Sequence, residues 1–284
     1  MDLLLNIVKS ILYGIVQGIT EWLPISSTGH LILMEQFLPL NLFSDAVSNT
    51  QFWNMYKVVI QFGSILAVLL LYWKKLNPFA KTLKPQRKKS IWRMWAMILI
   101  ASIPAAVIGL VLNDLIDEKL STPFVIACTL IIYGVLFIWM ENRQHNYAIE
   151  DVHQIGPKNA FEMGLFQCLA LIPGTSRSGS TIFGGTMLGF DRPTAAEFSF
   201  YMSIPVMFGA SLLKIVKAVA GHMAFTASAV LVLLVGMVTA FIVSVIAIRY
   251  LMNYIRKHDF KVFGYYRIVL GIIVLIFGFA GLLG

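Results

Sequence analysis

The chain is poor in charge and in cysteine for its length. Only 13% of its 284 residues are charged, whereas 58% are hydrophobic, and a soluble domain carries about 25% charged residues. A water-soluble domain is therefore not expected. The two cysteines, Cys128 and Cys168, both lie within apolar runs and lack the spacing of a metal or redox site. We expect them to serve as packing residues.

Two familiar signals are also missing. No Gly-Lys-Ser or Gly-Lys-Thr follows a glycine at the spacing of a P-loop, so ATP binding is not indicated. The first apolar stretch has Asp2 before it and Lys9 within it, and it lacks the basic start and the small-residue cleavage site of a signal peptide. We expect this N-terminal segment to remain in the mature protein.

The charges that are present are unevenly placed. The chain has 22 Lys and Arg against 14 Asp and Glu, which gives a formal net charge of +8. Eight of the basic residues crowd the loop 74–93 between two apolar runs. Cytoplasmic loops of membrane proteins hold their cations in this way. We therefore predict that the basic residues lie beside membrane lipid and that the protein does not bind nucleic acid.

Charge-free apolar runs long enough to cross a bilayer predict six transmembrane helices. They lie at 58–73, 94–112, 123–140, 198–213, 223–248 and 268–284. If loop 74–93 is cytoplasmic, the segments 141–197 and 249–267 are cytoplasmic too. Both termini and the intervening loops are then predicted to lie outside the cytoplasmic membrane.

Two further apolar stretches, near 3–38 and 160–190, are interrupted by glycine, proline and small polar residues. Such backbone is tolerated at membrane depth only inside protein or beside a water-filled cavity. We therefore predict two re-entrant helix pairs, each turning at a polar tip. The whole chain is predicted to be an all-α integral membrane protein with a single domain over 1–284.

An internal repeat supports this topology. A shift of 150 residues matches Gln17 with Gln167 and Ser26 with Ser176. Each half then holds one re-entrant pair and three spans, an odd number, so the second half is predicted to be inverted. The halves lie near 1–145 and 146–284. Inverted repeats place a polar site near the midplane, where their broken helices meet.

The first tip combines a carboxylate, hydroxyls and an imidazole. Gln17 and Glu21 are four residues apart and share a helix face, which Pro24 is expected to end. An intramembrane carboxylate is a functional candidate by default, and a solvated or lysine-paired Glu21 at the interface is the alternative. A hydroxyl such as Ser27 beside an imidazole such as His30 is typical of an activated nucleophile. An interfacial histidine and helix-capping hydroxyls are the structural alternatives.

The second tip, Pro173–Thr181, holds a single arginine among glycines and small hydroxyl residues. A buried Arg177 needs an anion to offset the cost of burying its charge. Glu21 or Glu197 could be that anion in a structural ion pair, and Glu197 equally suits a helix N-terminus. We favour phosphate, because guanidinium matches its oxygens and glycine-rich turns present backbone N–H groups to an anion.

Three motifs closely resemble the bacterial undecaprenyl-diphosphate phosphatase family, also called the bacitracin-resistance protein. They run from Gln17 to His30, from Pro173 to Thr181 and from Glu197 to Phe200, and the likeness covers essentially the whole chain. It implies an enzyme of the bacterial cytoplasmic (inner) membrane that hydrolyses undecaprenyl diphosphate to undecaprenyl phosphate and inorganic phosphate. This reaction recycles the lipid carrier of peptidoglycan synthesis and is linked to bacitracin resistance.

The resemblance also assigns residues. The catalytic positions that it implies are Glu21, Ser27, His30 and Arg177, and it implies that Thr28, Ser176 and Ser178 line the phosphate site. We further predict that Gln17, Ser26, Gly174, Thr181 and Glu197 bind the substrate. The family is associated with Mg²⁺ or Ca²⁺, for which Glu21 is the candidate ligand, and with homodimers. The family's first acidic position is Gln17 here, which weakens any mechanism that needs two carboxylates on that helix face.

We therefore predict that the polyprenyl diphosphate lipid enters between the two tips, from the outer face, with its tail among the spans. Ser27 is predicted as the attacking group, His30 as its base, and Glu21 as the group that orients the imidazole or holds a cation. Direct attack by His30 is the alternative. A polyprenyl-phosphate transporter or flippase is the competing function, because inverted repeats with broken helices also build transporters.

Overall fold

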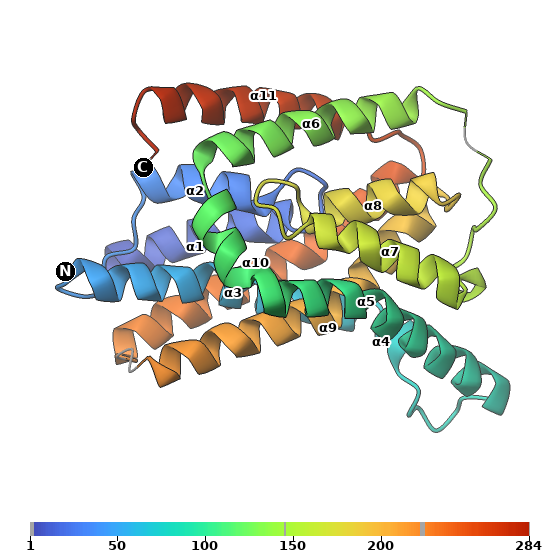
Figure 1. Cartoon of the computed structure of the whole chain (residues 1–284). Coiled ribbons are helices and arrows are strands. Elements are labelled where there is room, and N and C mark those ends of the chain that lie inside the picture. Colours follow the sequence, from blue (N-terminus) through green and yellow to red (C-terminus); the bar gives the residue numbers. More distant parts are fainter. Residues whose placement is uncertain (1–2, 145, 222–224, 284) are drawn as a thin grey trace.

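A computed structural model describes residues 3–144, 146–221 and 225–283, with the side chains of 113, 114, 117 and 118 left out. Over these residues the regular structure is helical, apart from one isolated bridge between Ile149 and Phe190 (Figure 1). The helices of the first half are α1 (Leu3–Thr20), α2 (Ser27–Phe37), α3 (Ala46–Leu71), α4 (Trp73–Leu76), α5 (Pro85–Leu120) and α6 (Pro123–Glu141). Those of the second half are η1 (Val152–Gln154), α7 (Pro157–Leu169), α8 (Arg177–Met187), α9 (Arg192–Ala220), α10 (Ala227–Ile255) and α11 (Lys261–Phe279). The predicted all-α fold is confirmed.

Seven of the described helices are long and apolar enough to cross a membrane. Six of them, α3, α5, α6, α9, α10 and α11, overlap the predicted spans, of which residues 223, 224 and 284 lie outside the described residues. The seventh is α1, which we expected to be half of a re-entrant pair. Its mean hydropathy of 1.5 is the lowest of the seven, because polar residues such as Asn6, Lys9 and Gln17 interrupt its apolar faces. The chain is a multi-pass membrane protein.

The first interrupted stretch forms a helix pair that doubles back on itself. Helix α1 ends at Thr20, and α2 begins at Ser27 after an irregular turn. The chain that leaves α2 returns to the start of α1, where Asn6 Nδ2 donates to the Asn41 carbonyl at 3.0 Å and Lys9 Nζ donates to the Pro39 carbonyl at 2.7 Å. The predicted break is therefore present.

The second interrupted stretch has the same form. Helix α7 ends at Leu169 and α8 begins at Arg177. The segments before α7 and after α8 meet in the bridge between Ile149 and Phe190. Both interrupted stretches are thus hairpins of two helices, and their re-entrant placement in the membrane stays a prediction.

Close helix packing holds the bundle together. Helix α6 lies along α11, as Figure 1 shows, while α10 packs against α1 and α3, and α5 packs against α7. A Cβ added at Gly134 of α6 would lie 2.7 Å from the Gly264 carbonyl of α11, and one added at Gly264 would lie 2.7 Å from the Gly134 carbonyl. Small residues of this kind let membrane helices approach closely.

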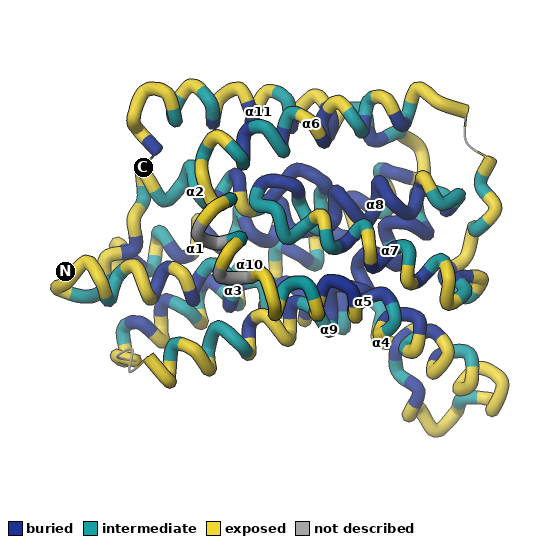
Figure 2. The backbone as a smooth tube through the Cα atoms, in the orientation of Figure 1, coloured by how far each residue is buried: buried dark blue, intermediate teal, exposed yellow. Residues whose placement is uncertain are grey.

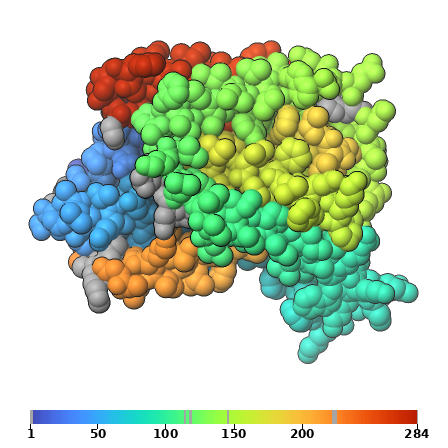
Figure 3. Space-filling view, in the orientation of Figure 1, coloured from blue at the N-terminus to red at the C-terminus, as the bar shows by residue number. Residues whose placement is uncertain are grey.

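Burial separates a packed interior from an apolar outside. Buried residues concentrate on the inward faces and around α8 (Figure 2), whereas side chains such as Leu110, Val111 and Phe279 are 71%, 75% and 81% exposed. An apolar exterior of this kind suits contact with lipid tails. Helix α4, the segment 77–84 and the first turns of α5 project from the body as an arm (Figure 3), which carries the basic residues of loop 74–93.

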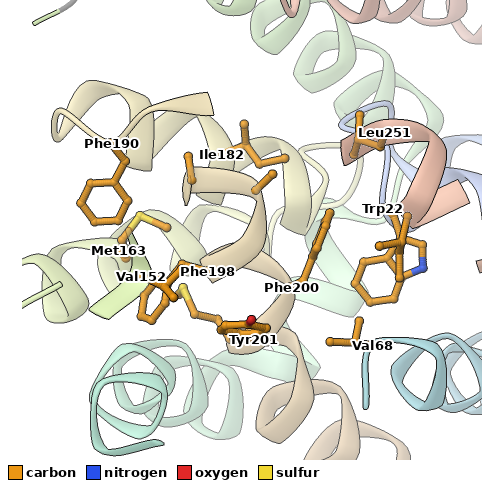
Figure 4. Packing of buried hydrophobic residues seen from close by; sticks show 14 of the residues in the cluster. Trp22, Val68, Val152, Met163, Ile182, Phe190, Phe198, Phe200, Tyr201 and Leu251 are labelled. Carbon is orange, nitrogen blue, oxygen red and sulfur yellow. The ribbon is translucent and has the colours of Figure 1, made fainter. Parts of the chain in front are cut away.

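The first tip is anchored in the interior by an aromatic residue. The indole of Trp22 is fully buried and packs edge-on against Phe200 of α9, with ring centroids 5.1 Å apart. Figure 4 shows Trp22 next to Phe200, with Val68 of α3 beside them. This contact fixes the turn between α1 and α2 against α9, the helix that also receives the second tip.

Candidate active site

The turns before α2 and α8 have the same unusual backbone. Ser26 has φ 72° and Ser176 has φ 73°, and among the described residues these are the two non-glycine residues with positive φ. Each hydroxyl accepts a hydrogen bond from the third residue of the following helix, Gly29 N at 3.3 Å and Gly179 N at 3.1 Å. Positive φ is rare outside glycine, and such strain concentrates at functional sites.

Arg177 and Glu21 join the two tips. Arg177 Nη2 donates to Glu21 Oε1 at 3.0 Å, and Arg177 Nη1 donates to the carbonyl and the hydroxyl of Ser199 at 2.9 and 3.2 Å. The side chains of Arg177 and Glu21 are only 12% and 6% exposed. The ion pair that we considered as a structural alternative is thus present, with Glu21 as the anion.

Glu21 also gathers the other polar side chains of the first tip. Its Oε2 accepts hydrogen bonds from Gln17 Nε2 at 2.9 Å and from the Ser27 hydroxyl at 3.3 Å. One carboxylate therefore contacts the predicted nucleophile and the predicted phosphate-binding arginine together. This arrangement leaves Glu21 as the nearest proton acceptor for Ser27.

His30 has different partners from those we expected. Its Nδ1 lies 2.7 Å from the Ser26 carbonyl oxygen, and its Nε2 lies 2.6 Å from the hydroxyl of Tyr266 in α11. Neither Ser27 nor Glu21 is hydrogen-bonded to the imidazole. The reason is local, because the Ser26 carbonyl four residues back captures Nδ1 and turns the ring towards α11. The structure therefore does not show the predicted contact between His30, as base, and the Ser27 hydroxyl.

A cavity of about 510 Å³ lies beside the tips, and residues of α3, α5, α7 and α9 line it. Six of the predicted residues line it: Glu21, Ser27, Thr28, Gly174, Ser176 and Arg177. Gln167, the counterpart of Gln17 in the internal repeat, and the cationic residues Lys57 and Lys214 also belong to its wall. Its volume is within the range of small-ligand sites.

The other predicted residues lie outside this wall. Ser178 donates to the Leu23 carbonyl at 3.2 Å and so joins the tips. Thr181 and Ser199 share a hydrogen bond of 2.6 Å, which supports the group that holds Arg177. Glu197 pairs with Lys75 at 2.7 Å and accepts from the Tyr201 hydroxyl at 2.6 Å. The structure therefore places Glu197 in a separate cluster, away from the cavity.

Arg267 is a further residue of the site, and we assigned it no role from the sequence. It is fully buried in α11, and it donates from Nη1 to the Pro24 carbonyl at 3.1 Å and from Nη2 to the Gly174 and Thr175 carbonyls at 3.0 and 2.8 Å. It thereby links the two tips from behind. We had placed it in a cytoplasmic loop, and its position next to a long apolar run was the only available signal.

The described residues do not form a cation site of their own. No group of three or more His, Cys, Asp and Glu among them could hold a metal ion. Glu21 is the one carboxylate in the cavity wall, and Arg177 already neutralises it. Mg²⁺ and Ca²⁺ need six or more oxygen ligands, which these side chains do not supply. The expected role of a divalent cation stays a prediction.

Two buried polar atoms at the cavity lack partners among the described residues. They are Arg177 Nε and Gln167 Oε1. An unsatisfied buried donor costs about 1–3 kcal/mol, and an oxyanion in the cavity would satisfy the guanidinium. The N-termini of α2 and α8, which begin at Ser27 and Arg177, also favour an anion. The cavity is therefore suited to an anionic group next to the Ser27 hydroxyl.

These features define a multi-pass helical membrane protein with a buried anion site between two broken helix pairs. The chain belongs to the bacitracin resistance protein BacA family, whose model matches residues 10–273. An undecaprenyl-diphosphatase of Acetivibrio thermocellus is 52% identical over 276 residues, covering 96% of this chain and 98% of that one. Undecaprenyl-diphosphatase 1 of Clostridioides difficile is 53% identical over 276 residues, with 97% of each chain covered.

Proposed function

We propose that this protein is an undecaprenyl-diphosphatase of the bacterial cytoplasmic membrane, which hydrolyses undecaprenyl diphosphate to undecaprenyl phosphate and inorganic phosphate. By returning the lipid carrier to cell-wall synthesis, this activity confers resistance to bacitracin. One observation carries the proposal: Arg177 of one tip and Ser27 of the other both contact Glu21 at the edge of the same cavity. The activity that the relatives' names state requires such an anion site beside a nucleophile.

Arg177 is the main source of electrostatic stabilisation. The terminal phosphate of the substrate accepts hydrogen bonds from its guanidinium, whose Nε has no partner among the described residues, and from the N-termini of α2 and α8. Positioning and charge stabilisation supply most of the catalysis of phosphoryl transfer. As the phosphate engages Arg177, it shares with Glu21 the positive charge of the guanidinium.

Ser27 is the attacking group. Its Oγ forms a bond to the terminal phosphorus, its proton passes to Glu21 Oε2, and the bridging P–O bond breaks with its electron pair leaving on undecaprenyl phosphate. A water molecule then attacks the phosphorus of the phosphoserine, and the P–Oγ bond breaks with its electron pair on Oγ. Glu21 returns its proton to Ser27 Oγ, and both protons of the water leave with the phosphate. Inorganic phosphate is released. The hydrogen bond of 3.3 Å between Ser27 and Glu21 supports this assignment of the base.

The cavity opens to the outer face in this proposal. If loop 74–93 is cytoplasmic, the loops 113–122 and 214–226 lie outside. Ser121, which follows the end of α5, and Lys214, near the end of α9, lie in these two segments and line the cavity together with the tips. The headgroup can therefore reach Arg177 from the outer leaflet, while the polyprenyl tail stays among the apolar helix faces.

Inverted halves are part of the same proposal. The twin turns at Ser26 and Ser176, which are counterparts at a shift of 150 residues, are what a two-fold relation between the halves produces. Phe62 and Phe208, which are counterparts at a shift of 146 residues, also touch each other, with centroids 5.9 Å apart. Contacts between counterparts are expected only near a symmetry axis.

The test is phosphate release from undecaprenyl diphosphate in detergent micelles. Ser27→Ala should lower kcat on the order of 1,000-fold, and Arg177→Lys about 100-fold, because lysine lacks the planar fork. Ser44→Ala, at an exposed serine away from the cavity, is the matched control. Normal turnover by the Ser27 variant would exclude the serine mechanism. A wild-type protein that binds the lipid but releases phosphate in neither micelles nor vesicles would instead be a transporter.

A further inference from the structure

Tyr266 of α11 is joined to His30 by two contacts. Its hydroxyl lies 2.6 Å from His30 Nε2, and the two rings stack with centroids 5.6 Å apart and an interplanar angle of 10°. The next residue, Arg267, is hydrogen-bonded to the carbonyls of both tips. Helix α11 therefore holds Tyr266 in a fixed position relative to the first tip.

The partners of the imidazole determine which nitrogen carries its proton. A carbonyl oxygen only accepts, so the contact of 2.7 Å with Ser26 requires Nδ1–H. No carboxylate is hydrogen-bonded to His30 among the described residues, so no partner of the ring stabilises the imidazolium, and we treat the imidazole as neutral. Nε2 then carries the lone pair and accepts the proton of the Tyr266 hydroxyl. The hydrogen bonds run in one direction, from Tyr266 through His30 to Ser26.

This series of hydrogen bonds ends at the strained turn that positions the nucleophile Ser27. Ser26 has φ 72°, and its carbonyl is the group that His30 holds. Ser27 follows directly and places its hydroxyl on Glu21. A strained backbone persists only when its surroundings over-determine it, and the imidazole supplies one of those constraints.

We infer that Tyr266 is a positioning residue of this phosphatase, which acts through His30 to hold the Ser26 turn and so keep the Ser27 hydroxyl on Glu21. The inference rests on the proposed function for its kinetic consequence only. In this inference His30 holds the Ser26 carbonyl through its Nδ1–H, whereas the sequence led us to expect that it acts as the base.

The first experiment compares two neighbouring tyrosines. Tyr266→Phe removes the hydroxyl and keeps the stacked ring, and Tyr265→Phe removes a hydroxyl from a side chain that is 58% exposed. In the micelle assay, Tyr266→Phe should lower kcat about 10- to 100-fold, because misplacing a reacting group by about 1 Å has this effect. KM should stay within about twofold, since the cavity is unchanged. Tyr265→Phe should match the wild type.

A second experiment distinguishes these two roles of His30. Asparagine at position 30 presents an N–H donor near the place of Nδ1, whereas alanine presents none. If His30 acts by holding the Ser26 carbonyl, His30→Asn should retain at least about 10-fold more kcat than His30→Ala. A general base would be lost equally in both variants. This comparison also decides the matter if Tyr266→Phe lowers the melting temperature so far that it cannot be assayed.

The ¹⁵N resonance of His30 Nε2, assigned with the His30→Asn variant, reports the hydrogen bond without any turnover. It should shift in Tyr266→Phe and remain in place in Tyr265→Phe. An inactive wild type would refute the proposed function and leave this measurement valid. The inference itself is overturned if an active wild type is matched by Tyr266→Phe in kcat, or if His30→Asn is as inactive as His30→Ala.

Discussion

Replacement of Arg267 by methionine is expected to separate the two tips. The guanidinium is fully buried and donates three hydrogen bonds of 3.1 Å or less to the carbonyls of Pro24, Gly174 and Thr175. Methionine fills a similar volume but donates nothing. These carbonyls belong to the irregular turns, so they have no helical partner that could replace the arginine.

The size of the effect follows from these contacts. Each buried acceptor left without a partner costs about 1–3 kcal/mol, while removal of a buried charge returns part of its desolvation cost. For three carbonyls we expect a net destabilisation of about 3 kcal/mol, together with a fall in kcat of about 100-fold as Ser27 and Arg177 lose their alignment. Arg267→Lys should be intermediate, because a single ammonium cannot match the guanidinium fork.

The assay combines thermal unfolding in detergent with phosphate release from undecaprenyl diphosphate. Arg249→Met, which removes an exposed arginine from α10, is the matched control and should leave both quantities unchanged. A methionine variant at position 267 with the stability and turnover of the control would show that the tips hold together without this guanidinium. Loss of activity without loss of stability would assign Arg267 to alignment alone.

Two further predictions concern the end of the molecule that carries loop 74–93. The side chain of Glu141 is fully buried and accepts hydrogen bonds from Arg192 and from the Phe260 backbone N–H. Glu141→Gln should therefore destabilise the protein by about 2 kcal/mol in thermal or denaturant unfolding. An unchanged unfolding midpoint would contradict this. Burial, with a contribution from Arg87, lowers the pKa of His153, which lies outside the membrane-spanning helices. The unfolded chain then binds the proton more readily, so stability should decline as the pH falls through about 6.5. His153→Gln should reduce this decline, and an identical pH profile would refute the assignment.

Local patterns carried much of the fold. Runs of apolar residues predicted six helices that the structure contains, because crossing a bilayer requires about 20 apolar residues in sequence. The interruptions near Pro24 and Pro173 predicted both broken pairs, since a proline followed by a run of small polar residues and glycine favours the end of an apolar helix. Helix α11 begins earlier than predicted, at Lys261 instead of 268, because the charge of Arg267 is satisfied inside the bundle.

The sequence also predicted the main functional residues of the two tips. Glu21, Ser27 and Arg177 are unusual in apolar surroundings, and a buried charge requires a partner. The structure brings these three together. The partners of Glu197 and His30 were not predictable in this way, because Lys75 and Tyr266 lie 122 and 236 residues away from them.

The sequence by itself determined the membrane class, the helical runs and the two polar interruptions, since each depends on residues that are neighbours along the chain. Only the tertiary structure decided which side chains meet at those interruptions. Arg267, fully buried, joins carbonyls from both tips, and the hydroxyl of Tyr266 in α11 pairs with Nε2 of His30. Such contacts depend on how α11 packs against the broken pairs, and no local sequence pattern determines this packing.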